Sequence, residues 1–208
     1  METSFKDSSL EDFTKVLASK APVPGGGGAS ALAAGLGISL AAMVGNLTAG
    51  KPKYAEHEEE VQQLLAQLEA LRARALELVD EDALSFAPLA AAYGIPKDDP
   101  QRPAIMEKAL ADACVVPLQI MELAAQGIMI NRRMAQIGSR LAVSDAAAGA
   151  AICKSAMEAA SLNVFINCKS MTDREAAAAL DAKARACLDN YGPLAQQVFD
   201  DVLAQLRG

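Results

Sequence analysis

Residues 54–93, YAEHEEEVQQLLAQLEALRARALELVDEDALSFAPLAAAY, contain the longest regular hydrophobic pattern in the chain. The apolar residues recur three and four positions apart, at Leu64, Leu68, Leu71, Ala75 and Val79. This spacing places their side chains on one side of an α-helix. The stretch therefore predicts a helix of about forty residues with one buried face.

Five further helices are expected around this one, with glycine- and proline-rich loops between them, at residues 8–19, 29–48, 103–130, 144–171 and 172–206. Ser9 and Thr172 resemble helix N-caps, and Pro117 should kink the fourth helix. The sequence contains no strand pattern that competes with these helices. The sequence thus predicts one all-α domain over residues 1–208, an elongated bundle of about six helices, two of them long. The long apolar stripes are expected to need a second subunit, which would give a dimer.

Composition favours the same fold class. Hydrophobic residues make up 52% of the 208 residues, yet aromatic residues only 4%, and Ala and Leu supply most of the apolar content. Ala and Leu lead the helix propensities, whereas strands favour β-branched and aromatic residues. The net charge of −7 would repel a phosphate backbone, so we expect no nucleic-acid partner.

Cysteine usage and charge distribution indicate a cytoplasmic protein without a metal centre. The four cysteines form no C-x-x-C pair, and the single His57 cannot complete a zinc set. Residues 1–7 lack the pattern of an export signal. Residues 21–50 carry no charge, which raises the question of a membrane span. They consist mostly of Ala, Gly and Pro, so a closely packed buried helix is the better interpretation, and we expect no membrane partner.

A glycine run precedes the helix expected at residues 29–48. Gly25, Gly26 and Gly27 resemble part of a dinucleotide fingerprint, but no strand precedes them and no phosphate-loop lysine follows. Two interpretations stay open. The run is either a tight turn between packed helices, or the backbone wall of a pocket at a helix N-terminus, where an anionic group is favoured.

Polar residues interrupt two apolar stripes. Asp82 continues the series Val79, Asp82, Phe86, Leu89, Tyr93, which sets a carboxylate into a buried helix face. It is either one partner of an ion pair or a catalytic group. Asn163 interrupts a stripe in the helix at 144–171, with Asn167 one turn further on. These two amides could read the edge of a heterocycle or merely link helices.

Charged or polar residues also occur in three places near helix ends. Lys51, Lys53 and Tyr54 follow the uncharged helix and could bind a polyanionic tail or form a solvated cationic turn. Asp173 follows Thr172 in the first turn of the last helix, where the helix dipole alone stabilises a carboxylate. Asp145 lies at the expected start of the helix at 144–171.

The order of these motifs resembles the cyclodeaminase/cyclohydrolase family, the C-terminal domain of formiminotransferase-cyclodeaminase. The resemblance covers nearly the whole chain and rests on residues 21–27, 43–48, 50–54, 80–83, 116–118, 144–145, 163–167 and 173. Pro52 departs from the usual run of lysines.

The resemblance implies an all-helical dimer that binds a tetrahydrofolate derivative in a cleft lined by the motif residues. It implies hydrolysis of 5,10-methenyltetrahydrofolate to 10-formyltetrahydrofolate, or alternatively cyclodeamination of formiminotetrahydrofolate with release of ammonia. No cofactor beyond the folate substrate and no metal are expected. A non-catalytic helical scaffold, or a folate-binding protein without turnover, is the alternative of another class.

The resemblance also suggests roles for individual residues. Asp82 is expected to be the catalytic carboxylate, with Asp145 as the reserve. The expected substrate-binding residues are Gly25, Gly26, Gly27, Lys51, Lys53, Tyr54, Asn163, Asn167 and Asp173. Among these, the asparagines would bind the pterin or the adduct oxygen, and the lysines the glutamate carboxylates.

Overall fold

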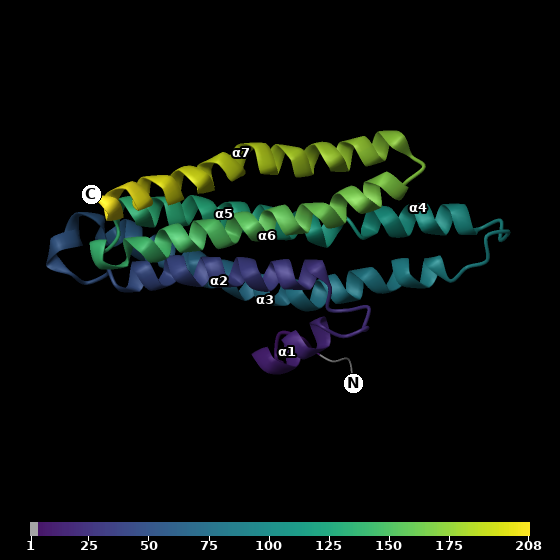
Figure 1. The fold of residues 1–208 in the computed structure, drawn as a ribbon, viewed down its shortest axis with the longest axis horizontal. Helices are drawn as coiled ribbons and strands as arrows, with labels where there is room; N and C mark the ends of the chain where they lie inside the picture. The colour runs from purple at the N-terminus through teal and green to yellow at the C-terminus, as the bar shows by residue number, and fades with distance from the viewer. Residues whose placement is uncertain (1–3) are drawn as a thin grey trace.

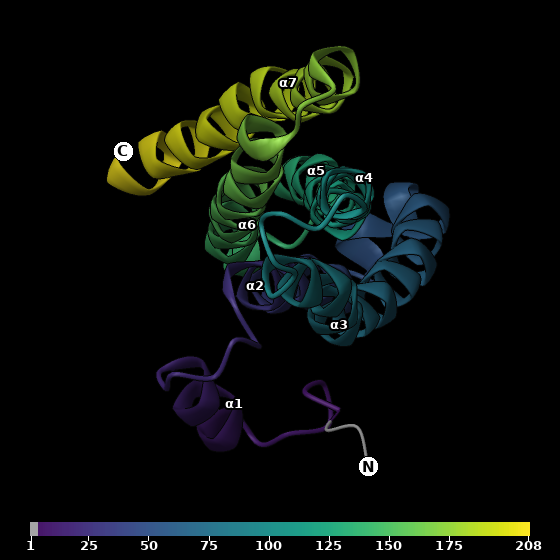
Figure 2. The same ribbon diagram turned by 90° about the vertical axis from the view of Figure 1, so that its right-hand side faces the viewer.

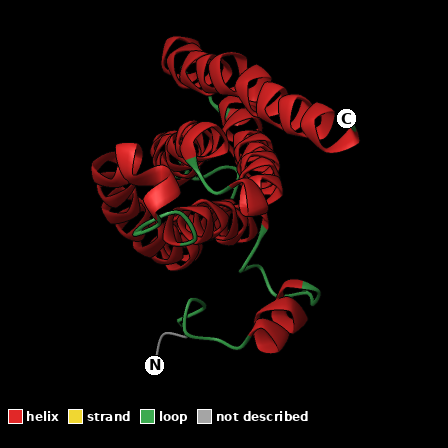
Figure 3. Cartoon of the chain, turned by 90° about the vertical axis from the view of Figure 1, so that its left-hand side faces the viewer, coloured by secondary structure: helices red, strands yellow, loops and turns green. Residues whose placement is uncertain are grey.

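A computed structural model describes residues 4–208. The N-terminal stretch in which no export signal is expected, residues 1–7, thus lies partly outside the described residues. Within this range the chain is helical and has no strands (Figure 3). The α-helices are α1 (Leu10–Leu17), α2 (Gly26–Asn46), α3 (Glu58–Tyr93), α4 (Arg102–Asp112), α5 (Val115–Ile137), α6 (Val143–Ser170) and α7 (Arg174–Arg207). Two 3₁₀ turns, η1 (Pro52–His57) and η2 (Arg140–Ala142), precede α3 and α6. The prediction of an all-α bundle is confirmed.

The bundle is elongated, with α2, α3, α5 and α6 running side by side along its length (Figure 1). Viewed from the end, α6 and α2 form one side, with α5 and α3 beside them (Figure 2). α7 packs on α6 and α5 along the top, and α1 lies apart below α2. The two long helices, α3 with 36 residues and α7 with 34, match the expected lengths.

Several helix boundaries differ from the sequence prediction. The helix expected from residue 54 begins at Glu58, after the 3₁₀ turn η1. α2 begins at Gly26 rather than residue 29, so the glycines form its first turn instead of a loop. The helix expected at 103–130 is divided into α4 and α5 at Ala113 and Cys114, and it continues to Ile137. Pro117 explains the division, because a proline has no N–H and its ring clashes with the carbonyl four residues earlier, here that of Ala113.

Helix caps follow the sequence in one case and shift in the other. The Ser9 side chain accepts a hydrogen bond from the Asp12 N–H, as expected for the N-cap of α1. The N-cap of α7 is Asp173, whereas Thr172 was expected in that position. The Thr172 N–H donates instead to the Glu107 carboxylate at 2.7 Å.

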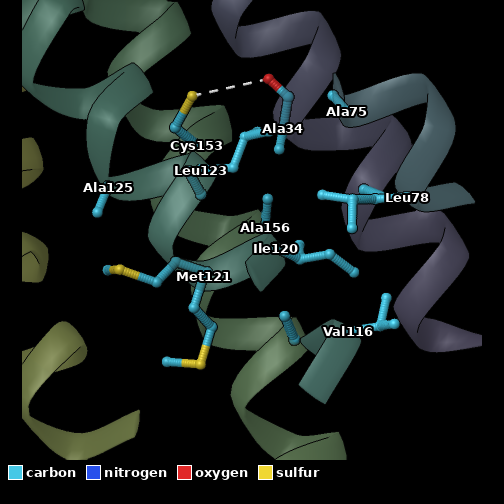
Figure 4. Close-up of a cluster of buried hydrophobic side chains, with 14 of the residues drawn as sticks. Ala34, Ala75, Leu78, Val116, Ile120, Met121, Leu123, Ala125, Cys153 and Ala156 are labelled. Atoms are coloured by element: carbon cyan, nitrogen blue, oxygen red, sulfur yellow. Dashed lines mark hydrogen bonds between the residues drawn. The ribbon is translucent and has the colours of Figure 1, made fainter. Parts of the chain in front are cut away.

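The core fills the space between α2, α3, α5 and α6 with alanine, aliphatic and sulfur-containing side chains (Figure 4). α2 and α6 approach so closely that the Cys153 Sγ lies 3.9 Å from the Ala34 carbonyl oxygen. Gly37 permits this approach, since a Cβ there would lie 2.5 Å from the Cys153 Sγ and 2.7 Å from the Gly149 carbonyl oxygen. The buried Asn131 amide donates to the Gly37 carbonyl oxygen at 3.1 Å and links α5 to the same crossing.

Gly37→Ala is therefore expected to lower the free energy of unfolding by about 1–3 kcal/mol, because the added methyl group forces α2 and α6 apart. Gly192→Ala is the matched control, since a Cβ at that helical glycine meets nothing within 4 Å. Gly192→Ala is expected to raise the free energy of unfolding by about 1 kcal/mol or less, because alanine favours a helix more than glycine does. Urea denaturation measures the free energy of unfolding of both variants. A Gly37→Ala variant as stable as Gly192→Ala would show that the crossing of α2 and α6 tolerates a side chain.

Two helical segments are long and apolar enough to cross a membrane, Gly26–Asn46 and Arg102–Ile137. In their most apolar windows, 56% and 67% of the residues are buried inside the bundle. Core helices of a water-soluble bundle have the same properties, so α2 matches the closely packed buried helix expected from its sequence.

Candidate functional site

The N-terminus of α2 meets the middle of α3 at Asp82. The Gly28 N–H donates to the Asp82 Oδ2 at 2.8 Å, so a carboxylate from another helix caps α2. Gly27 makes this contact possible, because a Cβ at that position would overlap the Asp82 carboxylate. Gly28 and Asp82 are 54 residues apart in the sequence, and the spacing of residues gave no indication of this hydrogen bond.

The two asparagines approach the same place from α6. The Asn163 Nδ2 lies 3.8 Å from the position that a Cβ on Gly26 would take. Asn167, one turn further along, is buried beside the Cys114 thiol. Within residues 4–208 the Asn163 side chain forms no hydrogen bond, so its amide is free to bind a ligand.

A cavity of about 310 Å³ lies between these groups. Its polar walls are Gly25, Gly26, Gly27, Asp82, Ser85, Asn163 and Asn167. Its apolar walls include Phe86, Leu89, Tyr93, Pro117 and Ile166. The volume is at the lower end of the range for small-molecule sites, and the mixture of apolar walls with a few convergent polar groups is typical of them.

The electrostatics of the cavity centre on Asp82. Burial raises the pKa of this carboxyl above its ordinary value, and the hydrogen bond from the Gly28 N–H opposes the rise. In the part of the chain that the structure describes, no lysine, arginine or histidine forms an ion pair with Asp82. The ion-pair interpretation left open by the sequence therefore has no support, and the carboxylate is available to a cationic ligand.

The first turn of α2 supplies further donors. The first backbone hydrogen bond of the helix runs from the Ala29 N–H to the Gly25 carbonyl oxygen, at 3.0 Å. The N–H groups of Gly26 and Gly27 have no partner inside the helix, as at every helix start. Together with the positive end of the helix dipole, they can bind a developing negative charge on oxygen.

Asp80, which belongs to the same motif as Asp82, has a structural role. Its carboxylate accepts hydrogen bonds from the Ser4 hydroxyl at 2.8 Å and from the Phe5 N–H at 2.6 Å. These bonds fasten the N-terminal segment to α3 beside the cavity.

Lys51, Lys53 and Tyr54 lie at the opposite end of the bundle. α2, which separates them from the glycines, has 21 residues and is therefore about 30 Å long. The Tyr54 hydroxyl accepts a hydrogen bond from the Arg140 N–H at 3.1 Å, and the Lys53 Nζ lies 5.6 Å from the centre of the Tyr54 ring. Within one chain these residues do not reach the cavity.

Asp145 and Asp173 also lie away from the cavity. Asp145 is in the first turn of α6, about 27 Å along that helix from Asn163. Asp173 caps α7 by accepting hydrogen bonds from the N–H groups of Glu175 and Ala176, at 3.1 and 2.9 Å. Capping accounts for the position of Asp173, and helix-dipole stabilisation for that of Asp145. The structure thus gathers six of the predicted site residues around one cavity, together with Ser85, and leaves the other five elsewhere: Lys51, Lys53, Tyr54, Asp145 and Asp173.

Comparison with known proteins identifies the family. The family model described as formiminotransferase-cyclodeaminase matches residues 9–186. The chain belongs to this family. A methenyltetrahydrofolate cyclohydrolase from Methylorubrum extorquens is 32% identical over 204 residues, which cover 96% of this chain and 98% of that protein.

Other members of the formiminotransferase-cyclodeaminase family are longer. The rat formimidoyltransferase-cyclodeaminase is 33% identical over 176 residues, and the match covers 83% of this chain but only 32% of the rat protein. A solved structure of formiminotetrahydrofolate cyclodeaminase from Thermotoga maritima superposes with a TM-score of 0.83 at 22% identity, covering 95% of this chain and 98% of that chain. This similarity confirms the helical fold.

Proposed function

We propose that this protein hydrolyses 5,10-methenyltetrahydrofolate to 10-formyltetrahydrofolate at the cavity between α2, α3 and α6. The observation that carries the proposal is Asp82, a half-buried carboxylate without a cationic partner that faces a cavity. The methenyl bridge is a planar amidinium cation, which such a carboxylate stabilises electrostatically. The near-full-length similarity to a methenyltetrahydrofolate cyclohydrolase supports the same substrate.

The reaction begins with addition of water to the bridge carbon. The Asp82 carboxylate orients the water and accepts one of its protons as the C–O bond forms. The N–H groups of Gly26 and Gly27 and the Asn163 amide stabilise the oxygen of the tetrahedral adduct. When the adduct collapses, the C–N5 bond breaks, N5 takes the proton from Asp82, and the hydroxyl proton passes to solvent. The formyl group remains on N10.

The second candidate is cyclodeamination of formiminotetrahydrofolate. The relatives named formimidoyltransferase-cyclodeaminase favour it. In this reaction N10 attacks the carbon of the protonated formimino group, and Asp82 takes the N10 proton and delivers it to the former imino nitrogen. The bond from carbon to that nitrogen then breaks, ammonia leaves, and the methenyl cation remains. Both reactions pass through a tetrahedral carbon between N5 and N10, so one site can serve either.

One assay distinguishes these functions. Purified protein is mixed with 5,10-methenyltetrahydrofolate, and the loss of the methenyl absorbance is followed against the uncatalysed rate. The same protein is then given formiminotetrahydrofolate while ammonia is measured. We expect faster turnover of the methenyl substrate. Turnover of neither substrate would contradict the enzyme proposal, and binding without turnover would indicate a folate-binding protein.

The pH dependence of this reaction follows from the raised pKa of Asp82. The ionised carboxylate is the active form, so kcat/KM should fall as pH falls through the pKa of Asp82. Because burial raises that pKa, the fall is expected above the ordinary aspartate value of about 4. A pH profile of kcat/KM tests this. The acidic limb should be absent from the residual activity of Asp82→Asn, and its persistence there would assign the titration to another group.

We also propose that the protein is a homodimer in the cytoplasm and has no nucleic-acid or membrane partner. It includes no metal and no cofactor beyond the folate. The charge of −7 and the burial of the two apolar helices support the absence of nucleic-acid and membrane partners. Within residues 4–208 no group of three or more histidine, cysteine, aspartate or glutamate side chains could hold a metal ion.

A further inference from the structure

A second cavity, of about 610 Å³, lies where α6 ends and α7 begins, and is named the α6/α7 cavity. Three residues of α6 and three polar residues of α7 line it: Phe165, Cys168, Lys169, Arg174, Asp181 and Arg185. The cavity beside Asp82 uses other residues of α6, Asn163 and Asn167. The two cavities therefore share α6 as a wall.

The α6/α7 cavity is cationic, although the chain has a net charge of −7. Lys169, Arg174 and Arg185 line it, whereas Asp181 is the one acidic side chain among its lining residues. Asp181 pairs with Arg185 at 2.5 Å, and Lys169 and Arg174 form no ion pair within residues 4–208. The Glu107 carboxylate, which lies near Arg174, is already bound by two N–H groups of the turn between α6 and α7. The cavity thus keeps an excess of positive charge, which attracts anions.

The two arginines are held in fixed positions. The Arg174 Nη1 donates to the carbonyl oxygens of Cys168 and Met171, both at 3.0 Å. The Arg185 guanidinium lies over the Phe165 ring, 5.4 Å from its centre. An anion that binds here therefore costs little side-chain freedom.

Two thiols meet beside this cavity. Cys168 lines it and is 4% exposed, and Cys114, at the start of α5, is fully buried. The Cys114 thiol is within hydrogen-bonding reach of the Cys168 thiol. Its Sγ lies 3.9 Å from the carbonyl oxygen of Val164, one turn before Cys168. In Figure 1 the end of α6 lies beside α4, just before Cys114 in the chain. Two thiols so placed on different helices can be joined by a disulfide bond.

Cys168 is expected to be the attacking thiol of this pair. Burial raises the pKa of the Cys114 thiol to about 12. Burial also raises the pKa of the Cys168 thiol, but by less, because the hydrogen bond from Cys114 and the charge of Arg174 oppose this rise and the effect of Asp181. The thiolate is the nucleophile in disulfide exchange, so the thiol with the smaller rise reacts first.

The chain provides its own comparison in Cys187. This thiol is half-buried and lines a different cavity, of about 560 Å³, between α3, α5 and α7. Burial and the neighbouring Glu122 carboxylate raise its pKa to about 11. No lysine or arginine is among the described residues that line that cavity. An anionic reagent is therefore repelled at Cys187 and attracted at Cys168.

We propose that the α6/α7 cavity binds a small anionic disulfide, of the class of glutathione disulfide, which oxidises Cys168 and Cys114 to a disulfide bond and thereby lowers activity at the cavity beside Asp82. The Cys168 thiolate attacks one sulfur of the bound disulfide, and the other half leaves as a thiolate that takes up the Cys168 proton. Cys114 then loses its proton and attacks the Cys168 Sγ, and the second half leaves as a thiol. The two protein thiols are oxidised, and the small disulfide is reduced to two thiols.

The effect on activity rests on the proposed function. The Asn167 side chain is hydrogen-bonded to the Cys114 thiol, and Ala113 and Asn167 both line the cavity beside Asp82. A bond from Cys114 to Cys168 moves the sulfur away from Asn167 and displaces Ala113. Displacement of cavity walls by about 1 Å is sufficient for a loss of roughly tenfold or more in kcat/KM.

Oxidation by glutathione disulfide tests the proposal. Reduced wild-type protein should lose the two thiol hydrogens, and peptide mapping should join Cys114 to Cys168. Turnover of the methenyl substrate should fall at least about tenfold and return with dithiothreitol. Cys114→Ser should accumulate a mixed disulfide at Cys168. Cys168→Ala should stay active and insensitive, and Cys187→Ser should respond like wild type.

Three results would overturn the proposal: a mixed disulfide that persists at Cys168 in wild type, oxidation that begins at Cys153 or Cys187, or an oxidised protein with full activity. If reduced wild-type protein turns over no folate, the proposed function fails. The peptide map still decides whether the disulfide bond forms, so the two failures are distinguishable.

A second comparison tests the class of ligand. The rate of Cys168 oxidation is measured with glutathione disulfide, an anion, and with cystamine, a disulfide that is a dication. The ratio of the two rates should fall about tenfold in Lys169→Glu, because the cavity then attracts the cation instead. Lys183→Glu, an exposed position of α7 outside the cavity, should keep the wild-type ratio. An unchanged ratio in Lys169→Glu would overturn the anionic site.

Discussion

Asp82→Asn is expected to lower kcat for 5,10-methenyltetrahydrofolate by about 10²–10⁴-fold, the range typical of the loss of a general acid–base group. The asparagine keeps the shape of the side chain and an oxygen that can accept the hydrogen bond from the Gly28 N–H. It removes the negative charge that faces the substrate cation and the group that carries the proton. Loss of the methenyl absorbance under single-turnover conditions measures the effect on the chemical step.

Stability provides the control for this variant. Burial raises the pKa of Asp82 in the folded protein, so the folded state binds this proton more tightly than the unfolded state. Ionisation of Asp82 at neutral pH therefore destabilises the fold, and stability from this group falls as pH rises through the folded-state pKa. Asp82→Asn should be at least as stable as wild type at pH 7, with the difference shrinking at acidic pH. A folded variant with wild-type kcat would contradict the catalytic role, and a variant that unfolds at pH 7 would contradict the predicted stability.

Gly27→Ala is expected to lower kcat/KM by at least about tenfold to a hundredfold, because displacement of a reacting group by even 1 Å costs about that much. The methyl group would occupy the space of the Asp82 carboxylate. To make room, the carboxylate has to turn away from the cavity or the first turn of α2 has to move. Either change breaks the alignment of Asp82 with the free N–H groups of Gly26 and Gly27. Steady-state kinetics with the methenyl substrate measures the loss.

The control for Gly27→Ala is the same substitution at Gly192, in α7, where a Cβ meets nothing. Gly192→Ala should retain wild-type kcat/KM. The combination Gly27→Ala with Asp82→Asn should be little worse than Asp82→Asn alone, since both changes disable the same carboxylate. Additive losses in this double variant would show that Gly27 acts independently of Asp82.

The helical fold could be predicted because its signal is local. The spacing of Leu64, Leu68 and Leu71 sets a period, and the period places α3 without knowledge of its neighbours. The start of α2 could not be predicted in this way. Glycines usually end helices, and Gly26–Gly28 become helical here because a distant carboxylate caps them, an interaction that leaves no trace in local spacing.

The residues of the candidate site, like the helices, could be predicted only where the signal is local. Asp82 and Asn163 stood out because each interrupts an apolar stripe, and the structure places both beside one cavity. The periodic pattern says which face a side chain is on, but not at which end of a bundle it lies. The resemblance therefore grouped Lys51 and Asp145 with Asp82, although α2 and α6 hold them at the opposite end of the bundle.

A crystal structure with a folate analogue whose one-carbon bridge resists hydrolysis tests the central claim most directly. We predict that the bridge carbon lies in the cavity between α2, α3 and α6, with the Asp82 carboxylate within hydrogen-bond distance of the position of the attacking water. The N–H groups of Gly26 and Gly27 should point at the same place. A folate bound elsewhere, or an Asp82 that contacts only the Gly28 N–H while the ligand occupies the cavity, would contradict the account.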